Sequence, residues 1–174
     1  EDFVPLRIAN KVETAAKWLE VGQNVAARVS ARFLYGAPAA NLTGEGRVSF
    51  QQDPQPFPAF KDYQFGLVQD DFHGLTQNPE PFTTDDKGAA QFNVLLQGAP
   101  DTSVPMTAEI AASVFDIGGR SVNARAHLPV RMRDVEVGLK AKFKDGLAEN
   151  QDAGFDLIAV DKTGKLMSNR PLHY

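Results

Sequence analysis

The sequence predicts an all-β protein: an antiparallel β-sandwich followed by part of a second sandwich. Two observations carry this prediction. Apolar and polar residues alternate with a period of two along much of the chain, as in strands that place one face on a core and the other in water. Turn sequences rich in glycine and aspartate separate these runs at short intervals. Many short strands punctuated by turns are typical of a sandwich.

The clearest predicted strand covers residues 25–33. Its one face carries only apolar side chains, while the other carries two arginines, a serine and an alanine. A helix would need apolar residues at a spacing of three to four, which this segment lacks. We therefore expect a strand with one buried face.

Further strands are expected wherever the same alternation returns. The strong runs are residues 90–96, 106–114, 122–128, 135–143 and 153–159, and the weaker ones are 6–8, 47–51 and 63–67. Residues 115–120 join two strong runs closely enough to predict a hairpin. Two proline-containing stretches, 52–60 and 72–82, cannot be central strands, because proline has no N–H for a ladder. We expect both to be long surface loops of the first domain.

The aromatic residues on and around these loops are the candidate contact residues. Phe57, Phe60 and Phe72, with Phe65 between them, are candidates for contact with a neighbouring domain. The alternative, weighed equally, is that these rings cap the open end of the sandwich. The alternation breaks near Pro129 and then restarts. We therefore predict a first domain over residues 1–130 and, over 131–174, the N-terminal strands of a following, incomplete domain.

Composition and motifs exclude several function classes. The 174 residues include no cysteine, so disulfides, thiol nucleophiles and Cys-based zinc or iron–sulfur sites are excluded. The net charge of −4 gives no basic surface for nucleic acid. The three histidines lie far apart, and no phosphate-binding loop or nucleophile elbow occurs. We predict no cofactor or metal, and a hydrolase built on Asp71 and His73 is the weakest of the hypotheses.

Several short stretches carry a resemblance to a known family. They are residues 1–8 (EDFVPLRI), 31–40 (ARFLYGAPAA) and 65–67 (FGL), with 147–150 and 155–165 similar to the opening of a following domain. Together they resemble the macroglobulin-type domains of bacterial alpha-2-macroglobulins. The block 35–40, a strand that runs into a bend of small residues, is the most specific of them.

The resemblance implies a fold and a role. The fold would be a seven-stranded fibronectin- or immunoglobulin-like sandwich, repeated along a large protein. Such proteins are protease traps of the bacterial periplasm, often anchored to the inner membrane by a lipid, and many hold the protease through a thioester. The Cys-x-Glu-Gln thioester motif cannot lie in a chain without cysteine. The chain would then be a non-catalytic scaffold and no enzyme.

The expected partners follow from the same resemblance. They are neighbouring domains of the parent chain and, through the parent, host or foreign proteases. The chain opens on Glu1, which suggests a piece of something longer. Half a sandwich would leave apolar strand faces and edges without partners, so self-association through residues 131–174 is also expected. The alternative function is an immunoglobulin-like adhesin or surface-binding module.

Overall fold

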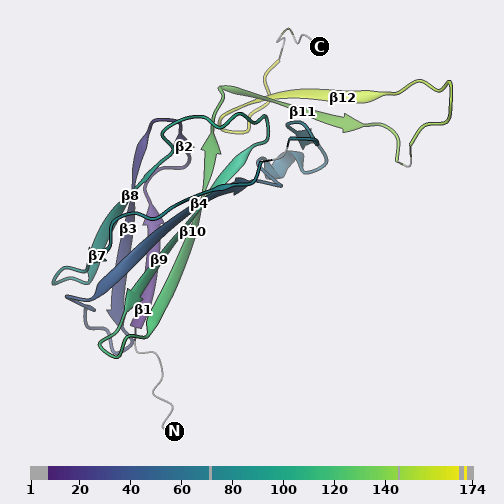
Figure 1. Cartoon of the computed structure of the whole chain (residues 1–174). Helices are drawn as coiled ribbons and strands as arrows, with labels where there is room; N and C mark the ends of the chain where they lie inside the picture. The colour runs from purple at the N-terminus through teal and green to yellow at the C-terminus, as the bar shows by residue number, and fades with distance from the viewer. Residues whose placement is uncertain (1–7, 71, 145, 169–170, 172–174) are drawn as a thin grey trace.

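The computed structural model describes residues 8–70, 72–144, 146–168 and 171. Within them the chain forms twelve strands and one short 3-10 helix, arranged in a larger and a smaller unit (Figure 1). The elements are β1 (Ile8–Thr14), β2 (Leu19–Glu20), β3 (Asn24–Phe33), β4 (Thr43–Gln52), η1 (Pro58–Phe60), β5 (Gln64–Phe65), β6 (Leu75–Gln77), β7 (Phe82–Thr83), β8 (Ala89–Leu95), β9 (Met106–Phe115), β10 (Ser121–Arg131), β11 (Val135–Ala141) and β12 (Phe155–Asp161).

The larger unit is a sandwich of two sheets, which confirms the predicted fold class. One sheet has the order β1-β3-β8, and the other has the order β2-β10-β9-β4-β6, with β7 also paired to β4. The long strands pair antiparallel, and β9 and β10 form the predicted hairpin. The short β2 departs from the prediction, because it pairs parallel with β10 over two residues.

The core of the larger unit lies between the inward faces of these sheets. In β3, Val25, Ala27, Val29 and Ala31 are buried, as the alternation predicts. From the other sheet, β9 buries every second residue from Met106 to Val114. Each buried Val, Leu or Ile side chain stabilises the fold by about 1.5–3 kcal/mol relative to exposure. Two interlocked apolar faces therefore hold the sheets together.

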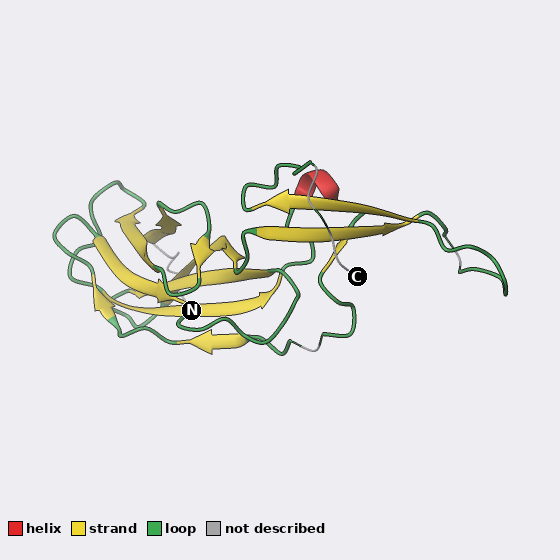
Figure 2. Ribbon diagram, turned by 90° about the horizontal axis from the view of Figure 1, so that it is seen from above, coloured by secondary structure: helices red, strands yellow, loops and turns green. Residues whose placement is uncertain are grey.

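The smaller unit projects from one end of the sandwich as the β11–β12 hairpin (Figure 1). Its sheet has the order β12-β11-β5, and β5 comes from the middle of the larger unit's sequence. The adjoining helix η1 lies against the β11–β12 pair (Figure 2). Beyond the end of β4, residues 53–60 form no strand, as predicted, and Pro58–Phe60 is the helix η1. The sequence did not predict that this stretch packs on the smaller unit, where Phe57 is buried with Val160. Its assignment to the first domain stays a prediction. Residues 72–82 carry only the short β6 at a sheet edge and the start of β7.

The predicted division at residue 130 falls between two strands that the structure shows. β10 ends at Arg131 and β11 begins at Val135. The pairing of β5 with β11 crosses that division, so the two predicted domains share one sheet. The boundary itself stays a prediction.

Candidate interdomain junction

The two units meet at a small buried cluster, which we call the junction. It consists of three apolar residues, Phe57, Phe65 and Val160, and two charged ones, Arg131 and Glu136. Phe57 and Phe65 are each only 4% exposed, and their rings lie 4.9 Å apart in a tilted arrangement. Val160, next to the C-terminal end of β12, is fully buried against them. This second core is separate from that of the sandwich and draws its rings from one unit and its strands from the other.

A glycine in β11 makes this packing possible. Gly138 lies opposite Phe65 in the β5–β11 pair. A Cβ at Gly138 would lie 2.8 Å from the Phe65 ring and 3.1 Å from the Ile158 side chain. The ring therefore occupies the space that any other side chain would take.

The structure brings two of the three candidate aromatics to this region. Phe57 is inside the junction, while Phe60 is half-buried beside it and meets Tyr63 edge to face at 6.1 Å. Phe72 lies elsewhere, packed against the core of the larger sandwich. Whether these rings contact further domains of a longer protein stays a prediction.

Arg131 is the residue that ties the segments of the junction together. Its guanidinium lies 4.5 Å from the centre of the Phe57 ring. Its Nε donates to the Lys162 carbonyl at 3.0 Å, and Nη2 donates to the Pro56 carbonyl at 3.2 Å. Burial lowers the pKa of Arg131, against the opposing charges of Asp53 and Glu136. A cation over an aromatic face contributes about 2 kcal/mol when desolvated. Residues 53–70 leave the larger unit, pack on the smaller one and return, and we call this segment the excursion. Arg131, the last residue of β10, thus binds the excursion at Pro56 and the turn after β12 at Lys162.

Glu136 is the second buried charge of the junction. It is 8% exposed, and its Oε1 lies 3.8 Å from Nη1 of Arg133. Burial raises the pKa of Glu136, although Arg133 and Arg131 act in the opposite direction. Nη2 of Arg133 also donates to the Thr102 carbonyl at 2.6 Å. The linker between β10 and β11 is thereby fixed to both units.

The Asp70 carboxylate binds the larger unit at the point where residues 53–70 return to it. Oδ2 of Asp70 accepts from the Ser103 hydroxyl at 2.6 Å and from the Ser103 backbone N–H. The same hydroxyl oxygen accepts from the Leu67 N–H at 2.8 Å. The bonds from Ser103 lower the pKa of Asp70. Residues 67–70 are therefore anchored next to the backbone that Arg133 binds.

At the surface, Lys162 of the smaller unit forms ion pairs with Glu20 of the larger unit and with Asp134 of the linker between them. Nζ of Lys162 lies 3.1 Å from Oε1 of Glu20 and 2.9 Å from Oδ1 of Asp134. The bonds to Asp134 and Glu20 raise the pKa of Lys162. Exposed pairs of this kind contribute roughly 0–1 kcal/mol, so the buried groups carry more of the junction's energy.

A comparison with known families matches the larger unit together with the whole of residues 53–70. The model of the bacterial alpha-2-macroglobulin MG5 domain matches residues 7–131, well over half of the chain. The chain belongs to the bacterial alpha-2-macroglobulin family. This confirms the family resemblance, and residues 31–40 lie within the matched range. Residues 1–7 of the opening stretch lie outside the described residues.

Individual alpha-2-macroglobulins match over nearly the whole chain. The Escherichia coli K12 protein is 25% identical over 94% of this chain and 11% of its own length. The alpha-2-macroglobulin homolog of Yersinia pestis is 31% identical over 92% of this chain and 8% of its own. The crystal structure of the trypsin-activated E. coli protein matches with a TM-score of 0.77 at 25% identity, over 92% of this chain and 12% of that one. The chain thus spans about a tenth of the length of these alpha-2-macroglobulins.

One face of the β11–β12 hairpin is apolar and uncovered. Val137, Leu139, Phe155 and Leu157 are 40%, 40%, 43% and 59% exposed. The register pairs Leu139 with Leu157, Val137 with Ala159 and Ala141 with Phe155, so these side chains share a face. The opposite face carries Glu136 and Gly138 and is the one covered by the junction. In β11, the apolar residues of the alternating pattern therefore lie on the exposed face of the hairpin.

The charged residues of the junction were not among the residues predicted to be functional. Arg131 stands at the break in the alternation, a position that indicates a role in the boundary. Glu136 gave no such signal, because its apolar neighbours Val135 and Val137 make it look solvent-facing. Among the described residues no three His, Asp or Glu side chains gather at metal-binding distance, and no helix is long and apolar enough to cross a membrane. Asp71, one of the two residues of the hydrolase hypothesis, lies outside the described residues.

Proposed function

We propose that this chain is a non-catalytic scaffold segment of a protease-trapping alpha-2-macroglobulin. In this role it holds two consecutive macroglobulin-like units in a set orientation. The family match supports the first part. The buried junction supports the second, because separating the units would expose the Phe57 and Phe65 rings to water and break the bond from Arg131 to the Lys162 carbonyl.

We further propose that the parent protein acts on proteases in the periplasm and is held at the inner membrane by a lipid. The E. coli relative supports the protease partner, since its solved structures include forms activated by trypsin and by porcine elastase. Fractionation of the source cells, with metabolic labelling by a fatty acid, tests the location. Recovery of the parent in the cytosolic fraction, or in the periplasm without lipid, would overturn that part alone.

The scaffold role is tested in the full-length parent protein with Arg131→Ala. The matched control is Arg28→Ala, an exposed arginine on the outer face of β3. Trapping is measured as the protease activity that remains on a large protein substrate relative to a small peptide substrate. We expect Arg131→Ala to weaken trapping and Arg28→Ala to leave it unchanged.

The isolated 174-residue chain provides the complementary measurement. As a scaffold it leaves a protease fully active on a large substrate. Protection by the isolated chain would contradict the proposal, and so would unchanged trapping by the Arg131→Ala parent. The adhesin alternative loses its motivating observation, because Phe57 is buried in the junction and Phe60 is half-covered beside it.

A further inference from the structure

The two long sides of the larger sandwich differ. On the β1 side, Nδ2 of Asn10 donates to the carbonyls of Ala112 and Val122, at 2.9 and 3.0 Å. These bonds tie β1 to β9 and β10 and close that side. On the other side, a groove of about 630 Å³ runs between β8 and residues 77–82. This groove opens along the outer edge of the β1-β3-β8 sheet.

Uncharged amide side chains surround the groove. They are Gln77, Asn78, Gln91, Asn93 and Gln97, and Glu80 is the one ionisable residue of the lining. Within the described part of the chain, none of these five amides makes a side-chain hydrogen bond. Each amide offers both donors and an acceptor, the pattern that a peptide backbone presents in return.

The edge of β8 is itself unprotected. Its backbone pairs with β3 on one side, and the carbonyls of Ala89 and Leu96 accept bonds from Asp85 and Gly22 at its two ends. Between those ends, in the residues that the structure describes, no backbone bond joins β8 to any segment other than β3. Edge strands are commonly protected by charge or proline, and β8 carries neither.

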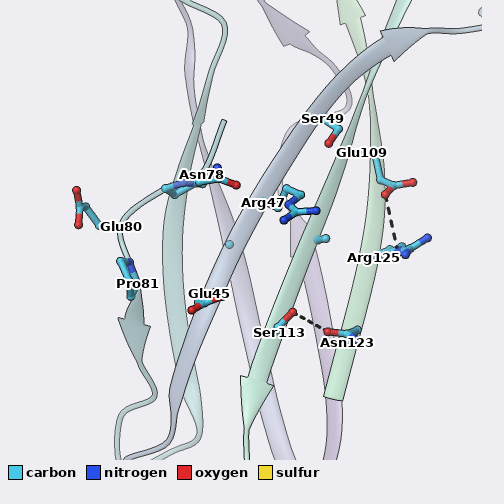
Figure 3. A pocket seen from close by; sticks show the side chains of 13 residues that line it. Glu45, Arg47, Ser49, Asn78, Glu80, Pro81, Glu109, Ser113, Asn123 and Arg125 are labelled. Atoms are coloured by element: carbon cyan, nitrogen blue, oxygen red, sulfur yellow. Dashed lines mark hydrogen bonds and ion pairs between the residues drawn. The ribbon is translucent and has the colours of Figure 1, made fainter. Parts of the chain in front are cut away.

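Residues 78–81, on the side of the groove opposite β8, cannot pair with the β8 edge as a strand. Residues 78–81 run Asn-Pro-Glu-Pro, and the two prolines have no N–H with which to pair. The same segment also lines a second hollow, which lies over the outer face of β4, β9 and β10 (Figure 3). That second hollow carries charged side chains, and some of its polar groups bond to one another. Nε of Arg125 lies 3.8 Å from Oε1 of Glu109, and the Ser113 hydroxyl bonds to Oδ1 of Asn123 at 2.6 Å (Figure 3). The two hollows therefore differ in chemistry.

We propose that the β8 groove binds an extended peptide segment with uncharged side chains, which adds to the edge of β8 as a further strand. The edge supplies backbone hydrogen bonds, and the five amides bond the outer side of the added segment. The lack of basic residues and the single Glu80 favour an uncharged segment. A glycan is disfavoured, because the rings of the lining, Phe82 and Phe92, stack on each other at 5.9 Å and do not offer an open platform.

The test uses the whole chain and a blocked seven-residue peptide of alternating threonine and valine. Backbone amide exchange and NMR shifts are measured along the protein with and without this peptide. We expect added protection and shifts on β8, centred between Ala90 and Leu95. We expect none with the same peptide methylated at every backbone nitrogen, because it cannot donate to the edge.

Paired variants separate the groove from the rest of the surface. Gln91→Ala with Asn93→Ala removes two of the amides and should weaken binding about tenfold, the equivalent of two modest hydrogen bonds. Gln51→Ala, an exposed amide on β4, is the matched control and should bind as the parent chain does. Equal binding of the methylated peptide, protection away from β8, or binding of glycans in place of the peptide would each overturn the proposal.

Discussion

Glu136 and Asp70 are two carboxylates near the junction whose surroundings act on them in opposite ways. Glu136 is buried on β11 and loses water, so the pKa of its carboxyl is raised. Asp70 keeps its contact with water and gains hydrogen bonds from Ser103, so its pKa is lowered. The chain's stability should therefore depend on pH in two directions at the single-residue scale.

Replacing Glu136 by Gln should stabilise the chain at neutral pH. Above the ordinary pKa of 4.5 the unfolded chain loses a proton that folded Glu136 still holds, so its contribution to stability falls as pH rises through the folded pKa. Gln cannot ionise, and we expect a gain of about 1 kcal/mol at pH 7 and no difference near pH 4. Urea unfolding at both pH values measures it, and a loss at pH 7 would show that the pair with Arg133 outweighs desolvation.

Replacing Asp70 by Asn should have the opposite pH signature. The stability that Asp70 contributes is present above its ordinary pKa of 3.8 and is lost as pH falls through the lower pKa of the folded state. We expect Asp70→Asn to lower the melting temperature at pH 7, with the difference shrinking in acid. Asp101→Asn, in the same turn region but with no bond to Ser103 among the described contacts, is the control. A deficit that persists unchanged in acid would indicate lost packing instead of lost charge.

At the scale of elements, the pairing of β5 with β11 rests on the missing side chain of Gly138. Gly138→Ala would place a Cβ 2.8 Å from the Phe65 ring. We expect a loss of about 1–3 kcal/mol, as for other overpacked sites, with faster amide exchange in β11 and β5. The matched control is Gly98→Ala, where a Cβ meets nothing within 4 Å. Unchanged exchange in Gly138→Ala would show that the ring moves aside at little cost.

The long strands could be predicted from the sequence because their buried residues are apolar and alternate with polar or exposed ones. β3 and β9 pack on a core over their whole length, so each second side chain is apolar. The pairing of β5 could not be predicted, because its two residues find a partner more than seventy positions away. In β11 the alternation predicts a strand correctly but not which face is buried. Its apolar residues Val137 and Leu139 are exposed, and the buried face holds Glu136 and Gly138.

The junction was only partly predictable for the same reason. Phe57 and Phe60 drew attention as aromatics on a proline-rich loop, and Phe72 shared that signal but packs in the main core. Local sequence distinguishes an unusual loop, whereas only the tertiary arrangement decides which core each ring enters. Arg131 and Glu136 become junction residues through contacts with segments distant in sequence.

At the scale of the whole molecule, the uncovered face of the β11–β12 hairpin should make the isolated chain self-associate. Val137, Leu139, Phe155 and Leu157 form a contiguous apolar surface that one chain does not bury. We expect sedimentation velocity to show a dimer fraction that rises with concentration. Leu139→Lys with Leu157→Lys should abolish it.

The control for this effect lies at another exposed apolar side chain. Leu34, just after β3, is 68% exposed, so Leu34→Lys changes charge and hydropathy without touching the hairpin. It should leave the dimer fraction unchanged. A concentration-independent monomer for the unaltered chain would contradict the prediction, and loss of dimer in Leu34→Lys would move the contact to the other surface.

The route of residues 53–70 has a consequence for how such proteins can be recombined. These residues belong to the larger unit by sequence, yet they supply β5 and the Phe57 ring to the smaller one. A cut at residue 131 would remove from the smaller unit one strand and two of the three buried residues of its core. Exchanging macroglobulin-like units between relatives would therefore require moving residues 53–70 together with the unit that follows, so the interchangeable piece of this chain is discontinuous in sequence.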